Sequence, residues 1–590
     1  MQKNWIVLPQ PPLEFLEAHP ELQPIVSELL YQRKLVTPAA IDEFLNPDYS
    51  QDIHDPFLFR DMRKAVERLF QAIEKKERLT IHGDYDADGV SASVILTGLF
   101  NALDYHNFSV FLPHRETDGY GLNKNTVQLL ASEGTKVIIT CDCGISNQEE
   151  VTLANSFGMD VIITDHHTVP PILPDAYAII HPKVPEETYP DKTLSGGGVA
   201  FKLLQAMLQL HEQKHELLPN GERPEALEKW SLDMVAISSV ADMVPLLHES
   251  RTLTKYGLIV LNKTRRIGLQ KLLLEARLMH NDGQMKSELT TDTIGFQIAP
   301  RINAAGRMNH ANVAYRLLVT NDPIEAINLA YELNQNNQER QRLVEGVMRE
   351  AVKQAEAQKE MPVLFIIGND WPVGIIGLIA GKIKERYYKP TMVITQSQAE
   401  LIGSGRSIAE LDMIEALQEI PQVFKKFGGH PMACGFTLNP AISLTECQTI
   451  CTQKFQEKII ISDTSAKLII DAQIDLDEVN WELYDIIQKF SPFGQDNPKP
   501  KYLARDLTVT ALEPVGKDKK HLRLMVRSKT GRIRKTIGWG LCNPEKNDQV
   551  DWGKALAIGD KIDLVFEIDV NEWNGNRELQ LTIVDLRRAL

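Results

Sequence analysis

The chain has few cysteines and no long apolar run. Its 590 residues include only 6 cysteines, too few to hold a chain of this length with a disulfide framework. No apolar stretch approaches the roughly 20 residues that a membrane-spanning helix needs. The opening MQKNWIVLPQPPLEF also lacks the apolar region of a signal peptide. We therefore expect a cytoplasmic protein that makes no use of a membrane.

Positive charge is scarce as well. The formal net charge of −15 argues against nucleic acid as a partner for the chain as a whole. The charge is uneven, however, because VGKDKKHLRLMVRSKTGRIRKT (residues 515–536) carries nine Lys or Arg against one Asp. This basic stripe is either a local phosphate-binding surface or the solvated face of a hairpin, and the residues alone leave both readings open.

The length and the order of apolar patterns predict an α/β multidomain protein. One hydrophobic core cannot organise 590 residues, so three or four domains are expected. After a helical N-terminal leader (1–50), strands alternate with helices within 51–333, which predicts a doubly wound parallel sheet. The polar segment 334–360 predicts a long linking helix. A second, smaller α/β domain (361–462) follows, and short strand-like runs over 463–590 predict a small β-barrel.

Acidic and imidazole side chains follow four successive predicted strands. The clusters read IHGDYDAD, PHRETDGYG, CDCG and DHH. Because the carboxyl ends of parallel strands lie along one edge of a sheet, where ligands bind, these side chains should meet in one crevice. Asp242, at the end of another apolar stretch, is a further candidate. The converging side chains are His82, Asp84, Asp86, Asp88, Asp142, Asp165, His166 and His167.

Clustered carboxylates predict bound cations. Like charges at this spacing repel and raise each other's pKa. Oxygen ligands with a few imidazoles suit Mg²⁺ or Mn²⁺ better than structural zinc, and this many carboxylates suit two ions about 3.5–4 Å apart. The alternative is that Asp84 or Asp88 caps the following helix. Either role fits a single aspartate, but capping explains the whole set poorly.

The cysteines give a weaker signal. Cys141 and Cys143 are separated by one residue and have no second pair nearby in the sequence, so small buried side chains are favoured over a zinc site. Cys447 and Cys451 have helical spacing and are expected in a core.

The motifs resemble a known family. DHH after one strand, DxD after an earlier strand and an isolated Asp between them are similar to the DHH phosphoesterase superfamily. A longer series resembles the RecJ exonucleases within it, over nearly the whole chain: GDYDADG, PHRETDGYGLN, DHH, LSGGGVAFKL, ADMVPL, APRINAAGRM, GSGRS, FGGHPMACGF and PFGQDNPKP. The resemblance implies a DHH domain (51–333), a DHH-associated domain (361–462) and a C-terminal OB-fold (463–590).

The resemblance also implies a function. RecJ exonucleases digest single-stranded DNA from the 5′ end by two-metal-ion hydrolysis, release 5′-mononucleotides and act in DNA repair and recombination. Two Mn²⁺ or Mg²⁺ ions, a monomer, a single-strand-binding protein and a RecQ-type helicase are implied with it. Two alternatives stay open: a related phosphodiesterase for short oligoribonucleotides or cyclic dinucleotides, and a non-catalytic single-strand-binding protein. The basic stripe argues against the first, and the intact acids argue against the second.

By the family pattern, the metal ligands map to Asp86, Asp88, Asp142, His166 and Asp242. His82 stands at a further ligand position of the wider superfamily, and Asp84 is an added acid of the RecJ form. The pattern leaves open which of these two ligates. Asp142 is implied as the bridging ligand. His167 is implied as the contact to the scissile phosphate.

Contacts to DNA are implied in the same way. Arg301, Asn303 and Arg307 in APRINAAGR are expected near the cut because arginine pairs well with phosphate, although the two arginines could instead form internal ion pairs. Arg406 is expected at the 5′-phosphate. Pro372 stands where many relatives have His, which removes one side-chain contact.

The FGGH segment, with Gly428, Gly429 and His430, is expected to bring backbone N–H groups close to a phosphate, or else to be a plain turn. On the barrel, basic residues are expected to track the single strand, while Trp573 either stacks on a base or packs in a hairpin. The basic residues are Lys517, Lys519, Lys520 and Arg523.

Overall fold

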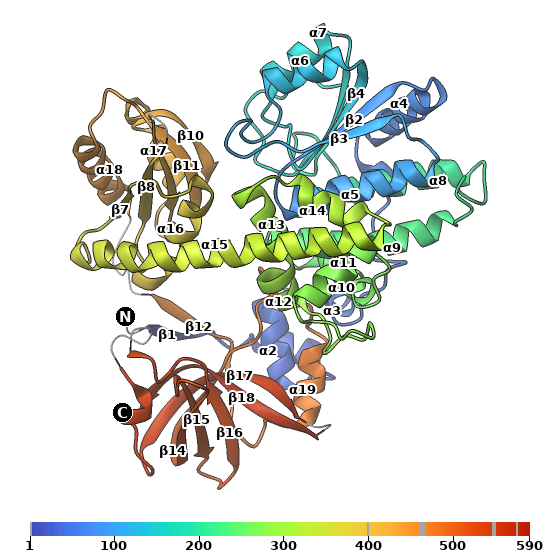
Figure 1. The fold of residues 1–590 in the computed structure, drawn as a ribbon. Helices are drawn as coiled ribbons and strands as arrows, with labels where there is room; N and C mark the ends of the chain where they lie inside the picture. The colour runs from blue at the N-terminus through green and yellow to red at the C-terminus, as the bar shows by residue number, and fades with distance from the viewer. Residues whose placement is uncertain (1–2, 398–399, 460–465, 545–549, 574–575, 590) are drawn as a thin grey trace. The chain divides into compact units, whose positions relative to one another are not determined.

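The computed structural model describes residues 3–397, 400–459, 466–544, 550–573 and 576–589 (Figure 1). The chain forms two compact units. One combines the two ends of the chain, Met1–Pro47 and Asp463–Leu590, and the other is Asp48–Ser462. Across the described ranges, none of the helices has both the length and the apolar character needed to cross a membrane.

A five-stranded parallel sheet lies at the centre of the larger unit, in the order β3-β2-β4-β5-β6. Val137 and Ile139 of the third strand in this order enter one core, whereas Ile138 between them enters another, because successive side chains of a strand point to opposite faces. Burial on both faces confirms the predicted doubly wound sheet. The strands are β2 (Arg78–Gly83), β3 (Phe108–Phe111), β4 (Thr135–Cys141), β5 (Asp160–Thr164) and β6 (Ala178–Ile180).

Helices cover both faces of this sheet (Figure 1). Helix α5 follows directly after β2, and it is buried along almost its whole length because it packs against the sheet, α8 and α9. The helices of the larger core include α4 (Met62–Glu74), α5 (Ala87–Ala102), α8 (Gly196–Glu212) and α9 (Pro224–Ala241), and the opposite face carries α6 (Lys124–Ser132) and α7 (Gln148–Ser156).

A helical region completes the first part of the larger unit. The region contains one π-helix, in which the hydrogen-bond ladder is widened by one residue, and a separate 3-10 turn before α4 packs against α4 and α8. Its elements are η1 (Pro56–Leu58), α10 (His248–Leu261), α11 (Ile267–Glu275), α12 (Thr291–Thr293), the π-helix η2 (Ile294–Ile298), α13 (Ala299–Met308) and α14 (Asn312–Val319).

The predicted linking helix is longer than 334–360 and starts earlier. Helix α15 spans Pro323–Ala357, with the Asp322 side chain accepting from the N–H of Ile324 and proline at the first turn. The first turns belong to the core of the parallel sheet through Leu329 and Leu333. From the sequence, residues 323–333 were predicted to belong to the preceding helical region. The later turns of α15, in contrast, pack against the second sheet.

The second sheet is mixed, in the order β10-β11-β9-β8-β7, with only β7 and β8 parallel. This smaller α/β part agrees with the predicted fold class. Cys447 and Cys451 are buried in its core, as their spacing predicted. The elements are β7 (Leu364–Gly368), α16 (Val373–Tyr387), β8 (Thr391–Ser397), β9 (Glu400–Arg406), α17 (Met413–Gln418), η3 (Pro421–Val423), β10 (Phe424–His430), β11 (Ala433–Leu438) and α18 (Leu444–Lys458).

A closed five-stranded barrel dominates the smaller unit. Its strands run in the order β14-β15-β16-β18-β17, and pairing of β14 with β17 closes it, which confirms the predicted barrel. The elements are β12 (Lys467–Ile470), β13 (Ala472–Gln473), α19 (Trp481–Gln488), β14 (Tyr502–Val515), β15 (His521–Arg527), β16 (Ile533–Gly538), α20 (Trp552–Ala555), β17 (Lys561–Trp573) and β18 (Asn576–Arg588).

The N-terminal leader is not purely helical and belongs to the barrel unit. Strand β1 (Asn4–Val7) pairs in parallel with β12. The helices α1 (Leu13–Ala18), α2 (Pro24–Gln32) and α3 (Pro38–Leu45) follow. Arg33, directly after α2, donates to Asn497 Oδ1 and to the carbonyl of Pro498. The PFGQDNPKP motif therefore contacts the end of α2. The four-residue β1 is too short, and its partner too distant in sequence, for pattern reasoning to find it.

A buried ion pair ties α8 to α10. Lys202 Nζ lies 2.5 Å from Glu249 Oε1, and both side chains are fully buried. Glu249 also accepts from Tyr189 Oη (2.6 Å) and from the backbone N–H of His54 (2.9 Å).

Replacing Lys202 with methionine is expected to lower the free energy of unfolding by about 3–5 kcal/mol, because a buried carboxylate loses its counter-charge. Urea unfolding followed by circular dichroism measures this change. Lys359→Met, which removes a pair between two exposed side chains (Lys359 and Glu356), should leave the midpoint nearly unchanged. Equal midpoints for Lys202→Met and the unmodified chain would contradict the prediction.

Candidate functional site

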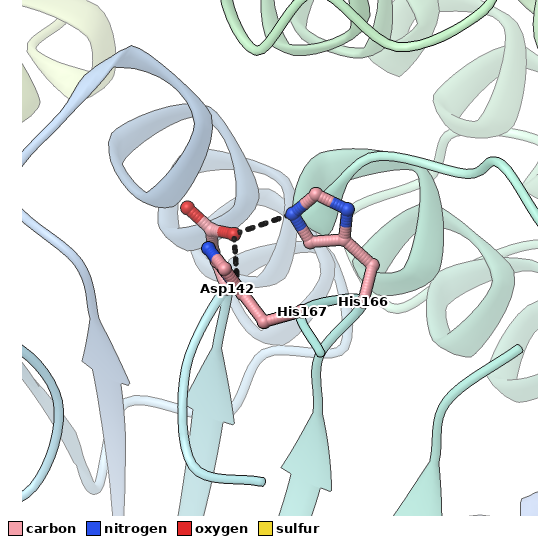
Figure 2. A group of neighbouring side chains, drawn as sticks. All are labelled: Asp142, His166 and His167. Carbon is pink, nitrogen blue, oxygen red and sulfur yellow. Dashed lines mark hydrogen bonds and ion pairs between the residues drawn. The ribbon is translucent and has the colours of Figure 1, made fainter. Parts of the chain in front are cut away.

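Acidic and imidazole side chains meet at the carboxyl edge of the parallel sheet. Asp84 and Asp86 follow β2, Asp142 follows β4, and the histidines follow β5. Figure 2 shows Asp142 and the two histidines, from the ends of neighbouring strands, lying against one another. Asp142 has a left-handed backbone (φ 62°). Side chains from the ends of β2, β4 and β5 therefore lie close together at this edge of the sheet.

His166 lies at the centre of the cluster. Its Nε2 is 3.1 Å from Asp142 Oδ1 and 3.6 Å from one carboxylate oxygen each of Asp88 and Asp242. Within the described ranges, three sets of side chains place ligand atoms within 4.8 Å of one another. They are Asp142, His166 and His167; Asp88, His166 and Asp242; and Asp84, Asp86 and Asp142.

Asp142 belongs to two of these sets, one with the aspartates that follow β2 and one with the histidines. A carboxylate with two oxygens can serve two neighbouring ions. The arrangement is therefore suited to a pair of cations with Asp142 between them.

Helix N-termini hold two of the aspartates. Asp88 accepts from the N–H groups of Gly196 (2.8 Å) and Gly197 (2.7 Å), at the start of α8, and from Ser238 Oγ (2.5 Å). Asp86 accepts from the N–H groups of Asp88 and Gly89 and so caps α5. The capping alternative named Asp84 or Asp88, but the backbone gives this role to Asp86.

Close packing requires the first two glycines of LSGGGVAFKL, Gly196 and Gly197, which pattern reasoning did not assign to the site. A Cβ on Gly196 would lie 2.5 Å from Asp142 Cβ, and one on Gly197 would lie 2.5 Å from Ser238 Oγ. Contacts this short do not occur between real side chains. Three consecutive glycines at the start of a helix, where glycine costs stability, were the available signal.

The carboxylates destabilise one another. Burial, followed by the charges of Asp88 and Asp86, raises the pKa of Asp142 well above its usual value. Burial and the charge of Asp86 likewise raise the pKa of Asp84. For Asp242, burial and the charges of Asp88 and Asp86 raise the pKa to about 8. Buried carboxylates in such numbers need a compensating cation to remain ionised.

The two histidines have opposite electrostatic environments. Burial lowers the pKa of His166 to about 4, so at neutral pH its ring is uncharged and able to ligate. For His167, burial opposes the charge, but the hydrogen bond from Nδ1 to Asp165 Oδ1 (2.8 Å) and the charge of Asp165 raise the pKa to about 9. Asp165 also accepts from the N–H of Ile145 (3.0 Å). It therefore positions His167 and belongs to none of the three sets found in the described ranges.

Orphaned buried atoms also fit a metal centre. Asp84 Oδ1 and His82 Nε2 are buried without a hydrogen-bond partner among the described atoms. Asp84 is grouped with Asp86 and Asp142, whereas His82 is in no such set within the described ranges. Cys143 Sγ lies 3.7 Å from His82 Nδ1, and burial lowers the pKa of His82 to about 4. Oxygen donors with a neutral imidazole match Mn²⁺ and Mg²⁺.

Three polar side chains of APRINAAGR make hydrogen bonds to backbone groups. Asn303 Oδ1 accepts from the N–H of Ala87 (2.7 Å), so this partly buried side chain supports the first turn of α5. Arg301 donates to the carbonyl of Gln297 (2.7 Å), and Arg307 donates to the carbonyl of Gly374 (2.9 Å). These bonds lead to neutral acceptors.

Positive charge gathers around Arg307. Burial, then the charges of Arg115 and Arg340, lowers the pKa of Arg307 to about 10. Arg115 also lies over the Tyr85 ring, 3.9 Å from its centre, and opposes the raised pKa of Asp84. Like-charged guanidinium groups in proximity favour a bound anion. Sequence reasoning missed Arg115, because a single basic residue in a loop carries no signal.

The FGGH segment forms the end of strand β10, not a plain turn. His430 lies 6.0 Å from His167, ring centre to ring centre, in a stacked orientation, and its Nδ1 is 3.3 Å from Thr168 Oγ1. Gly428 and Gly429 precede it on the same strand. Arg406, at the end of β9, donates to Ser404 Oγ (2.9 Å). Pro372 directly precedes α16 without a side-chain cap.

The predicted basic residues of the barrel lie in the smaller unit. Arg523 pairs with Glu513 (3.2 Å), and Lys520 pairs with Asp518 (3.2 Å). The side chain of Trp573 lies outside the described part of the chain. Lys517 and Lys519 are exposed in the segment between β14 and β15, next to Lys520.

Three protein-family models match separate parts of the chain. The DHH family N-terminal domain matches residues 78–238, the DHHA1 domain 348–457 and the RecJ OB domain 470–585. They agree with the predicted order of a DHH domain, a DHH-associated domain and an OB-fold.

Known proteins match the whole chain. The single-stranded-DNA-specific exonuclease RecJ of Bacillus subtilis (strain 168) is 34% identical over 567 residues, covering 96% of this chain and 68% of that protein. RecJ from Thermus thermophilus in complex with Mn²⁺ is 26% identical with a TM-score of 0.81, covering 100% of this chain and 80% of that one. The complex of the same protein with Mg²⁺ is 25% identical with a TM-score of 0.75, covering 100% of this chain and 79% of that one. The sets of acidic and imidazole side chains, the order of the three matched domains and these relatives together show that the chain belongs to the RecJ family of DHH phosphoesterases.

Proposed function

We propose that this protein is a single-stranded-DNA-specific 5′→3′ exonuclease that hydrolyses phosphodiester bonds and releases 5′-mononucleotides. The observation that carries the proposal is the pair of side-chain sets that share Asp142, one with Asp84 and Asp86 and the other with His166 and His167. Its RecJ relatives are named single-stranded-DNA-specific exonucleases. A role in DNA repair and recombination follows from the same kinship.

Two Mn²⁺ or Mg²⁺ ions, when bound, would activate a water and neutralise the phosphodiester charge. Asp142 would lie between the ions, with Asp84 and Asp86 holding one of them. The carboxylates of Asp88 and Asp242 and the imidazole of His166 would hold the second ion.

His167 is the proposed contact to the scissile phosphate. The hydrogen bond to Asp165 keeps a proton on its ring at neutral pH, and a protonated imidazole attracts the phosphate anion. We propose that His430, whose ring is stacked against that of His167, contacts the same or the adjacent phosphate. Asp165 is a positioning residue in this scheme, since it acts through His167.

The DNA 5′ end is proposed to bind where positive charge gathers. Burial and the charges of Arg115, Arg340 and Arg406 lower the pKa of Arg307, and guanidinium groups bind phosphate through paired N–H donors. Gly428 and Gly429 would allow close approach of the phosphate to the β10 backbone. Arg301 and Asn303 are proposed, with Arg307, to contact the DNA backbone near the cut.

The exposed lysines of the barrel, with Arg523, are proposed to track the single strand before it reaches the site. A substrate as small as a cyclic dinucleotide would not need this surface. A monomer, a single-strand-binding protein, a RecQ-type helicase and cytoplasmic residence stay predictions from the sequence.

Digestion of end-labelled single-stranded DNA tests the proposal. With Mn²⁺, a 5′ label should appear at once as a mononucleotide, while a 3′ label should remain on progressively shorter strands. EDTA should abolish release, and added Mn²⁺ should restore it, because the ionised carboxylates need the cation. Blunt duplex DNA of the same sequence is the control and should persist. Early release of the 3′ label, or undiminished digestion in EDTA, would contradict the proposal.

A further inference from the structure

The segment His181–Lys183 directly follows β6, the last strand of the parallel sheet. Strand β6 pairs in parallel with β5, and the N–H of Asp165, just after β5, donates to the carbonyl of Ile180 (3.2 Å). The ends of the two strands therefore lie next to each other. This brings the segment after β6 against the two histidines of the DHH motif, which follow β5.

Both backbone carbonyls of the DHH histidines accept hydrogen bonds from this segment. Lys183 Nζ donates to the carbonyl of His166 (2.7 Å). His181 Nε2 donates to the carbonyl of His167 (2.9 Å). Asp165 Oδ1 in turn accepts from the backbone N–H groups of both histidines, at 2.7 and 3.1 Å. Every polar backbone group of the two histidines thus has a partner, so the main chain that carries the two imidazoles is held in one position.

The hydrogen bonds of His181 fix which of its ring nitrogens carries the proton. Its Nδ1 accepts from the backbone N–H of Lys183 (3.0 Å), so Nε2 is the protonated nitrogen that donates to His167. Burial lowers the pKa of His181 to about 4, which keeps the ring neutral at physiological pH. The side chain is fully buried, so water cannot replace the histidine as donor to this carbonyl.

Lys183 differs from His181 in its exposure. The residue as a whole is exposed, although its Nζ reaches the carbonyl of His166. Burial of the ammonium group lowers the pKa of Lys183, and the charges of Asp242 and Asp165 oppose this change. The ammonium group therefore lies within the field of the acids at the site. Because most of the side chain is exposed, replacing Lys183 removes a hydrogen bond without leaving a cavity in a core.

We propose that Lys183 and His181 are positioning residues for hydrolysis, and that each holds one of the DHH histidines through its backbone carbonyl. Lys183 would orient His166 as a cation ligand, and His181 would orient His167 toward the scissile phosphate. This inference rests on the proposed nuclease function, which gives the two histidines these roles. Outer partners of metal ligands contribute roughly 10–100-fold to cation affinity or to activity.

Calorimetric titration of the full chain with Mn²⁺, in the absence of DNA, tests the role of Lys183. Lys183→Met should weaken the binding of Mn²⁺ about tenfold or more, because His166 loses the partner that fixes its main chain. Lys183→Arg keeps a charged donor and should recover part of the affinity. Lys192→Met is the matched control, since exposed Lys192 also donates to a backbone carbonyl, that of Glu187 (2.9 Å). Unchanged or tighter Mn²⁺ binding by Lys183→Met would overturn its assignment.

Initial rates on single-stranded DNA at saturating Mn²⁺ test the role of His181. His181→Leu should lower kcat about tenfold or more and leave Mn²⁺ binding unchanged, because it frees the phosphate contact and not the cation ligand. His181→Gln, whose amide can donate to the carbonyl, should recover part of the rate. His211→Leu is the matched control, since His211 Nε2 also donates to a carbonyl, that of Leu217 (3.1 Å). A normal kcat for His181→Leu would overturn its assignment.

The two measurements separate this inference from the proposed function. If the unmodified chain does not digest single-stranded DNA, the proposed function fails, and the Mn²⁺ titration still decides the role of Lys183. If the unmodified chain digests DNA while both variants match their controls, the inference fails and the function stands. Melting temperatures show that each variant is folded. The exposed Lys183 keeps the test decisive even where a substitution of the buried His181 prevents folding.

Discussion

Replacing Asp142 with asparagine is expected to lower kcat on single-stranded DNA more than about 100-fold, since loss of even an outer partner of a metal ligand costs 10–100-fold. Asp142 is the residue shared by the two sets, so both ions would lose a charged ligand. Asparagine keeps the shape of the side chain and tolerates the left-handed backbone at this position. The change therefore removes charge with little strain.

Initial rates at saturating DNA and Mn²⁺ measure this effect, and calorimetry with Mn²⁺ measures the accompanying loss of ion binding. Asp104→Asn is the matched control, because Asp104 is also left-handed and its side chain is 74% exposed. A near-normal rate for Asp142→Asn would remove the basis of the metal assignment.

Replacing Gly196 with alanine is expected to lower kcat about 10–100-fold, as for other residues that orient metal ligands. The added methyl group would meet Asp142 Cβ at 2.5 Å. Either that side chain or the start of α8 must move. Moving the helix would also lengthen the hydrogen bonds that Asp88 accepts from Gly196 and Gly197.

Gly198→Ala provides the comparison within the same helix turn. A Cβ there would lie 3.3 Å from Ser195 Oγ, a contact that a small adjustment relieves, so its rate should fall far less. Gly381→Ala, on α16 with nothing within 4 Å of the added atom, should leave the rate unchanged. Melting temperatures check that each variant is folded. Equal rates for the Gly196 and Gly198 variants would contradict the packing argument.

The broad site was predictable because its signal is topological. Alternating strands and helices fix which ends of strands share an edge, so the positions of Asp86, Asp142 and His166 could be placed together from the sequence. The residue that caps α5 was not predictable. Three acids lie within five positions, and only the backbone path decides which one receives the amide groups.

Other roles depend on contacts between segments far apart in sequence. Asn303 lies between two arginines in a motif, and its Oδ1 accepts from the backbone N–H of Ala87, a contact that the motif alone does not reveal. Arg115 gains its significance from Tyr85 and Arg307. The packing of Gly196 against Asp142 likewise has no counterpart in local periodicity or composition.

The pairing of β1 with β12 has a consequence for synthesis on the ribosome. The partner strand of Asn4–Val7 emerges from the ribosome only after some 460 further residues have been translated. At about 5–20 residues per second, this interval lasts roughly 20–90 s. The larger unit lies between β1 and β12 in sequence, so it can fold while Asn4–Val7 are still unpaired, and the barrel unit forms after it. A ribosome that stalls after the larger unit but before β12 would leave that unit folded and the N-terminal strand without its partner.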